Sequence, residues 1–130
     1  MAKSKKRVLC IENELEMIDL IKLILERKGF EVLGAVGGRE GLETIRREKP
    51  DLILLDLMMP DVDGWEVYRQ MKADEELKNI PVIVVTAKAQ SIDKVLGLHI
   101  AKVDDYVTKP FGPKELLESV EKVLRMKSKV

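Results

Sequence analysis

Short runs of apolar residues alternate along this chain with stretches in which apolar side chains recur every three or four positions. The runs are typical of buried β-strands, and the periodic stretches are typical of amphipathic helices. The predicted strands span residues 8–11, 30–36, 52–56, 82–85 and 103–107. The first predicted helix spans about residues 14–28, and the second contains Leu42 and Ile45 and ends before Pro50. Three further helices are predicted to begin after Asp63, Ser91 and Gly112.

Residues that favour helix ends support these boundaries. Gly29 follows the first periodic stretch, and glycine is common just past the end of a helix. Asp63 with Glu66 three residues later is a capping-box pattern for the third helix. Ser91 is a suitable cap for the fourth helix, and Pro113 occupies the favoured first position of the last one.

Five alternations of strand and helix predict an α/β fold with a doubly wound, five-stranded parallel sheet and helices on both faces. The third and fourth strands are apolar along their length, as expected of strands that are covered on both sides. A chain of 130 residues with 45% hydrophobic content supports one core, so we expect a single domain over residues 1–130. The basic segments at residues 3–7 and 125–129 are expected to be short solvated tails.

Composition and charge argue against several classes of protein. Lysine plus arginine and aspartate plus glutamate each total 23, so the net charge of zero provides no field to attract nucleic acid. No apolar stretch is long enough to cross a bilayer, and residues 8–11 are too few for a signal-peptide core. We therefore expect a cytoplasmic protein that binds neither nucleic acid nor membrane directly. The single cysteine, Cys10, is expected to be a buried hydrophobic side chain.

Four of the predicted strands end in polar or charged residues. Glu12 and Asn13 follow the first strand, Asp56 ends the third, Thr86 follows the fourth and Lys109 follows the last. Ligands of open parallel sheets bind at the carboxyl ends of the strands, so these residues are candidates for one site. Strand order 2-1-3-4-5 would bring Glu12 and Asn13 beside Asp56. The alternative is that Asp56 is only a strand-end acid and Lys109 a surface lysine.

Three motifs resemble those of the response-regulator receiver domain, the phosphoacceptor module of two-component signalling. They are the turn from Asp56 to Gly64, the pair Thr86-Ala87, and the segment from Asp104 to Phe111, which contains Tyr106, Lys109 and Pro110. Their order along the chain also agrees with the family, and the resemblance covers nearly the whole sequence. It implies a flavodoxin-like fold with the strand order 2-1-3-4-5.

The resemblance also implies how the site works. Asp56 would take a phosphoryl group from a phosphohistidine on a sensor histidine kinase or phosphotransfer protein, forming an acyl phosphate. Lys109 would pair with one phosphoryl oxygen and Thr86 would donate a hydrogen bond to another. Tyr106 stands where the family has a rotating aromatic residue, so Thr86 and Tyr106 would switch the surface of the fourth helix, last strand and last helix. A downstream effector protein would bind this surface, and a phosphorylation-dependent dimer is a further option.

A divalent cation, Mg²⁺, is the cofactor that the resemblance implies. Its oxygen ligands would come from Glu12, Asn13, Asp56 and the backbone carbonyl of Met58. The family usually has two acids at the positions of Glu12 and Asn13, so the neutral Asn13 is a departure that should weaken metal binding. Asn13 with Glu16 also fits a capping box, and the sequence leaves open whether Asn13 is a cap, a ligand or both.

Other classes of function are weighed against the phosphoacceptor. An aspartyl-phosphate phosphatase needs a second acid two residues after its nucleophile, where this chain has Met58. A nucleotide-binding enzyme is disfavoured because no phosphate-binding glycine loop is present. We therefore expect no enzymatic activity beyond self-catalysed phosphoryl transfer and dephosphorylation. The main alternative is a receiver-like binding module that works without phosphorylation, which Asn13 suggests and the complete set of other site residues disfavours.

Overall fold

The computed structural model describes residues 5–87 and 103–128. Strands and helices alternate within these ranges as predicted. The elements are β1 (Arg7–Glu12), α1 (Leu15–Glu26), β2 (Glu31–Val36), α2 (Gly38–Glu48), β3 (Leu52–Asp56), α3 (Gly64–Lys72), β4 (Val82–Ala87), β5 (Asp105–Lys109) and α5 (Pro113–Ser128). The helix predicted behind Ser91 lies outside the described residues. None of the described helices is both long and apolar enough to span a membrane.

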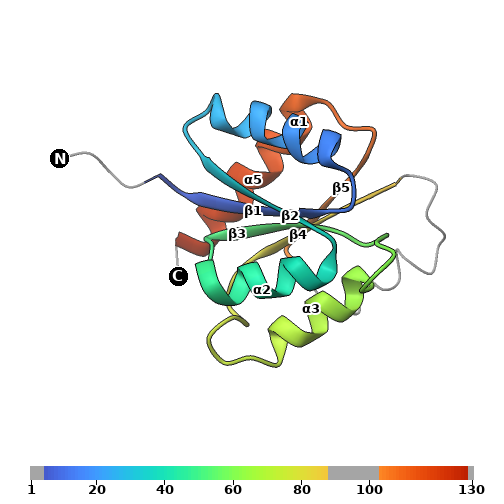
Figure 1. The fold of residues 1–130 in the computed structure, drawn as a ribbon. Helices are drawn as coiled ribbons and strands as arrows, with labels where there is room; N and C mark the ends of the chain where they lie inside the picture. The colour runs from blue at the N-terminus through green and yellow to red at the C-terminus, as the bar shows by residue number, and fades with distance from the viewer. Residues whose placement is uncertain (1–4, 88–102, 129–130) are drawn as a thin grey trace.

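The strands form one five-stranded parallel sheet in the order β2-β1-β3-β4-β5. Figure 1 shows α1 and α5 on one face of this sheet and α2 and α3 on the other. The doubly wound α/β fold and the strand order that the sequence predicts are both confirmed. Strand order reverses between β1 and β3, so their carboxyl ends flank the place where folds of this class bind ligands.

Two hydrophobic clusters, one on each face, hold the helices against the sheet. The α1–α5 cluster contains Ile21 of α1 and Val120 of α5, and the α2–α3 cluster contains Ile45 of α2 and Met71 of α3, all four fully buried. Every residue of β3 and residues 82–86 of β4 are also buried, so the central strands are covered on both sides as expected. Each buried aliphatic side chain contributes about 1.5–3 kcal/mol to the stability of these layers.

The last strand begins later than the sequence indicates. A strand is predicted at residues 103–107, whereas β5 spans Asp105–Lys109. The Asp104 N–H donates to the Val82 carbonyl at 3.0 Å, and the Asp104 carboxylate accepts from the Val82 N–H at 2.8 Å, just ahead of the strand. Val103 packs against the α2–α3 cluster. The predicted start of this strand is therefore wrong, because Val103 packs its apolar side chain into the core and is not part of the strand that pairs with β4.

The connection between β3 and α3 folds tightly around the end of β3. Asp63 caps α3 by accepting a hydrogen bond from the Trp65 N–H at 2.7 Å, which confirms the predicted helix start. The Glu66 side chain bonds within α3 and does not complete the capping box with Asp63. Gly64 packs so closely that a Cβ atom at this position would lie 2.5 Å from the Asp56 carbonyl oxygen. A larger residue would push the connection away from Asp56.

Asp61, in the same connection, caps a different helix. Its Oδ1 accepts from the Gly38 N–H at 3.0 Å and its Oδ2 from the Arg39 N–H at 3.1 Å, at the start of α2. Hydrogen bonds from these backbone groups lower the pKa of Asp61 to about 2. The N-cap residue of α2 is Gly37, which has a φ of 92° and no side chain with which to cap the helix. Asp61 therefore ties the segment that follows Asp56 to the helix that follows β2.

Replacing Asp61 by alanine should destabilise the fold by about 1 kcal/mol, because two N–H groups at the start of α2 lose their acceptor. The charged carboxylate stabilises the fold above its ordinary pKa of 3.8, and this contribution is lost as the pH falls towards about 2. The difference in free energy of unfolding between native protein and Asp61→Ala, measured in urea, should therefore be larger at pH 6 than at pH 3. Glu43→Ala, at an exposed acid of α2, is the control. An equal loss at both pH values would contradict this role of the carboxylate.

Candidate functional site

Three charged residues from three strands meet at the carboxyl edge of the sheet. Glu12 ends β1, Asp56 ends β3 and Lys109 ends β5. Lys109 Nζ lies 2.8 Å from Glu12 Oε2 and 3.8 Å from Asp56 Oδ2. Glu12 is 1% exposed and Asp56 is 3% exposed, so two buried carboxylates share one ammonium group. The convergence expected from the strand ends is confirmed for these three residues.

Side-chain alternation along the strands directs these charged groups to one face of the sheet. Each of them lies two positions beyond a residue of the α1–α5 cluster and therefore points to the same side. Those cluster residues are Cys10, Leu54 and Val107. Burial raises the pKa of the Cys10 thiol well above its usual range, which fits the expected unreactive side chain.

The two carboxylates carry more negative charge than Lys109 balances. Burial raises the pKa of Glu12, and the neighbouring Asp56 raises it further, while the hydrogen bond from Lys109 lowers it. A buried charge without a partner costs several kcal/mol, so a site of this composition needs further positive charge or hydrogen-bond donors. Such a group would act on the carboxylate oxygens of Glu12 and Asp56.

The Asp56 carboxylate is held by the main chain and borders a cavity. Its Oδ1 accepts a hydrogen bond from the Met58 N–H at 3.1 Å, which fixes the rotation of the carboxylate. The cavity has a volume of about 300 Å³ and is lined by Asn13, Glu14, Asp56, Met58, Ala87 and Lys109. The side chain of Met58 is half exposed, so the carboxylate borders an opening with no charged group at that position.

Asn13 lies against both carboxylates. With its side-chain nitrogen facing them, it donates to Glu12 Oε1 at 2.9 Å and to Asp56 Oδ2 at 3.2 Å, whereas the opposite orientation would set the amide oxygen against acceptors. The N-cap residue of α1 is Glu14, and no side chain caps this helix. The capping-box interpretation of Asn13 and Glu16 is therefore wrong, because the amide is engaged with the acids and lies one position before the cap.

Thr86 and Tyr106 lie on the opposite face of the sheet from the charged group. Asp56 pairs in register with Val85, so Thr86 is one residue further along the neighbouring strand. Thr86 is 4% exposed, and its hydroxyl has no hydrogen-bond partner within the described residues. Tyr106 pairs in register with Val84, which places it on the same face as Thr86, and it is 54% exposed. The buried hydroxyl of Thr86 is therefore available to donate to an incoming acceptor.

The oxygen atoms at this site fit a hard divalent cation. Carboxylates, an amide oxygen and a backbone carbonyl are the groups that Mg²⁺ binds in proteins, and Glu12, Asp56, Asn13 and Met58 provide them. Over residues 5–87 and 103–128, no three acids, histidines or cysteines come together as a metal-binding cluster. An amide stands where the resemblance leads one to expect a further acid. The role of these residues as ligands stays a prediction.

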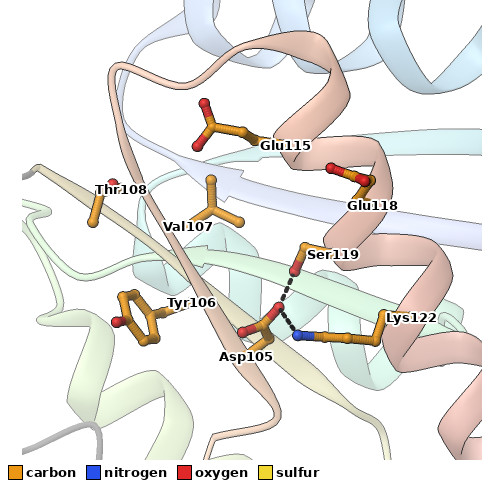
Figure 2. A pocket seen from close by; sticks show the side chains of 8 residues that line it. All are labelled: Asp105, Tyr106, Val107, Thr108, Glu115, Glu118, Ser119 and Lys122. Atoms are coloured by element: carbon orange, nitrogen blue, oxygen red, sulfur yellow. Dashed lines mark hydrogen bonds and ion pairs between the residues drawn. The ribbon is translucent and has the colours of Figure 1, made fainter.

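Another cavity, of about 450 Å³, lies between β5 and α5 (Figure 2). The Ser119 hydroxyl donates to Asp105 Oδ2 at 2.6 Å, and Lys122 Nζ lies 3.0 Å from the same oxygen. Tyr106 follows Asp105 and points away from α5 (Figure 2). The sequence gives little signal for this group, because Asp105 and Ser119 are 14 positions apart in different elements. These contacts fix β5 against α5 directly beside Tyr106.

Comparisons with known proteins agree with this geometry. The family model described as the response regulator receiver domain matches residues 8–121. The alkaline phosphatase synthesis transcriptional regulatory protein PhoP of Bacillus subtilis (strain 168) is 42% identical over 120 residues, which cover 92% of this chain and 49% of that protein. The chain thus spans about half the length of this relative.

Solved structures give the same assignment. A CheY-like response regulator receiver domain protein from Methanospirillum hungatei JF-1 has a TM-score of 0.89 and 32% identity, covering 97% of this chain and 98% of that one. The chemotaxis protein CheY4 of Vibrio cholerae has a TM-score of 0.85 and 25% identity, covering 92% and 99% respectively. From the family match, the 42% identical relative and the arrangement of the strand ends, we conclude that this chain belongs to the response regulator receiver domain family of two-component signalling.

Proposed function

We propose that this receiver domain accepts a phosphoryl group on Asp56 from the phosphohistidine of a sensor histidine kinase or phosphotransfer protein. The single observation that carries this proposal is the position of Asp56, which ends a buried strand beside a cavity with Lys109 Nζ 3.8 Å away. An isolated strand-end acid would have no need of a partly buried lysine that it shares with a second acid. The domain would otherwise have no enzymatic activity beyond the self-catalysed transfer and loss of this group.

In the transfer step, a carboxylate oxygen of Asp56 attacks the phosphorus atom. The new O–P bond forms as the N–P bond to the imidazole breaks, and the imidazole nitrogen keeps the electron pair of the broken bond. The hydrogen bond from the Met58 N–H to Asp56 Oδ1 holds the carboxylate in one orientation during this step. Attack therefore needs little rearrangement of the nucleophile.

Charge on the transferred group would be stabilised by residues from the neighbouring strands. Lys109 would move its ammonium group from Glu12 towards a phosphoryl oxygen, and the Thr86 hydroxyl would donate to another. Glu12, Asn13, Asp56 and the Met58 carbonyl would hold Mg²⁺, which supplies further positive charge to the phosphoryl oxygens when it is bound.

The proposed output is a change in the surface around β5. Thr86 and Tyr106 share one face of the sheet, so an inward movement of Thr86 towards the phosphoryl group would open space for the exposed Tyr106 ring. The partner would be a downstream effector protein, or a second phosphorylated copy of the domain, that binds β5, α5 and the helix predicted behind Ser91, which lies outside the described residues.

A second candidate function is a receiver-fold binding module that works without phosphorylation. The hydrogen bonds from Asn13 to Glu12 and Asp56 favour it, because they satisfy the acids by protein groups alone. The cavity beside Asp56 favours the phosphoacceptor, and so does the buried Thr86 hydroxyl, which has no hydrogen-bond partner in the part of the chain that the structure describes. Labelling with acetyl phosphate decides between the two functions.

Acetyl phosphate with Mg²⁺ should add one phosphoryl group to the protein, because Asp56 can attack a small donor through the adjoining cavity. Intact-mass measurement should detect the gain in native protein and no gain in Asp56→Asn. Asp19→Asn, which changes an exposed acid of α1, should be labelled like the native protein. Absence of labelling in the native protein would leave the binding module as the better candidate.

Replacing Asn13 by aspartate should tighten Mg²⁺ binding by about fivefold, because an added carboxylate near the cation contributes on the order of 1 kcal/mol of attraction. Isothermal titration calorimetry of both proteins would give the two dissociation constants. Glu14→Asn, at an exposed acid that also lines the cavity, controls for changes in overall charge at its mouth. Equal affinities in the native and Asn13→Asp proteins would rule this prediction out.

The acyl phosphate should be long-lived, with a half-life of minutes or more, because the side chain of Met58 has no group to orient an attacking water molecule. Met58→Asn supplies such a group and should shorten the half-life several-fold. Loss of the phosphoryl group can be followed by intact mass after the donor is removed. A half-life of seconds in the native protein would contradict this role for position 58.

A further inference from the structure

The strongest unexplained feature of the site is the orientation of the Asn13 side chain. Its nitrogen donates to Glu12 Oε1 at 2.9 Å and to Asp56 Oδ2 at 3.2 Å, so one primary amide bridges two acids from neighbouring strands. We call this pair of hydrogen bonds the amide clasp. A primary amide has two N–H donors on one nitrogen, which allows it to serve both carboxylates at once.

The clasp completes the hydrogen bonding of the two acids. Glu12 Oε2 accepts from Lys109 Nζ, and Glu12 Oε1 accepts from the backbone N–H of Asn13 as well as from its side chain. Asp56 Oδ1 accepts from the Met58 N–H. Asp56 Oδ2 has Lys109 Nζ only at 3.8 Å, which is beyond hydrogen-bond distance, so the clasp supplies its donor.

Solvent offers little hydrogen bonding to either carboxylate. Both are almost fully buried, and an unsatisfied buried carboxylate oxygen is costly. An aspartate at position 13 would have no proton to donate and would add a third negative charge to the same space. An alanine would leave Asp56 Oδ2 without its donor but would add no charge.

We propose that Asn13 holds Glu12 and Asp56 together without a metal ion, and that a divalent cation enters the site only by displacing the amide clasp. This inference rests on the proposed function only in so far as cation binding is part of that function. A cation bound by Asn13 needs the amide oxygen turned towards it, whereas the clasp turns the amide nitrogen towards the acids, so the two arrangements exclude each other. To act as a ligand, Asn13 would have to turn its oxygen towards the cation and give up both hydrogen bonds. Asn13 thereby sets the metal concentration at which the site becomes competent.

Thermal unfolding in the presence of EDTA tests the clasp without any phosphoryl donor. Native protein should have the highest Tm, Asn13→Ala should unfold about 5 °C lower, and Asn13→Asp should unfold lower still. Added Mg²⁺ should raise the Tm of Asn13→Asp by more than it raises that of the native protein. Asn79→Ala and Asn79→Asp are matched controls at the other asparagine of the chain, which is also exposed, and should leave the Tm unchanged.

A second measurement covers the case in which Asn13→Asp does not fold. In ¹⁵N-labelled native protein with EDTA, the side-chain amide protons of Asn13 should exchange with water more slowly than those of Asn79. Titration with Mg²⁺ should remove this difference, and Asp56→Ala should reduce it. Equal exchange of the two amides in EDTA, or an unchanged Tm in Asn13→Ala, would overturn the proposal.

The two proposals fail separately. If acetyl phosphate does not label Asp56 while the order of Tm values holds, the clasp stands and the phosphoacceptor role falls. If labelling succeeds while Asn13→Ala is as stable as the native protein in EDTA, the phosphoacceptor role stands and the clasp falls.

Discussion

Two buried carboxylates that share a single ammonium group are the constraint on which the rest of this site depends. Glu12 and Asp56 are both almost fully buried, and Lys109 lies closer to Glu12 than to Asp56. Removing one partner from such an arrangement costs about 3–5 kcal/mol, because the remaining charge is left buried and uncompensated. The surrounding groups therefore act as donors: the Met58 N–H and the Asn13 amide both point at carboxylate oxygens.

The geometry that maintains this arrangement comes from the connection after β3. Gly64 allows the chain to pass within van der Waals contact of the Asp56 carbonyl, and Asp63 starts α3 immediately before it. Asp61 fastens the same segment to α2. Asp56 is thus positioned by β3 and by the starts of α2 and α3, and its carboxylate keeps one orientation relative to Lys109.

Much of the fold and part of the site follow from local sequence patterns. Apolar runs and helical periodicity predict the order of elements, and the polar residue at the end of each run marks the edge where Glu12, Asp56 and Lys109 meet.

Features that depend on tertiary contacts do not follow from the sequence. The Asp61 cap joins residues more than 20 positions apart, and the sequence hints at it only through two glycines at a helix start that lacks its own cap. Val103 has the composition of a strand residue but packs without pairing, and Asn13 has the spacing of a helix cap but bonds to acids that the fold brings beside it.

Alternation along the strands has a consequence for how the domain divides its work. The ionised groups lie on the side of the sheet covered by α1 and α5, whereas Thr86 and Tyr106 lie on the reverse side. One layer of backbone separates the two groups, so under the proposed function a change at Asp56 would reach Tyr106 through β4. Substitutions beside Asp56 would then alter the chemistry, and substitutions around Tyr106 would alter recognition of the partner. A sheet used in this way would let one small domain be matched separately to its phosphoryl donor and to its effector.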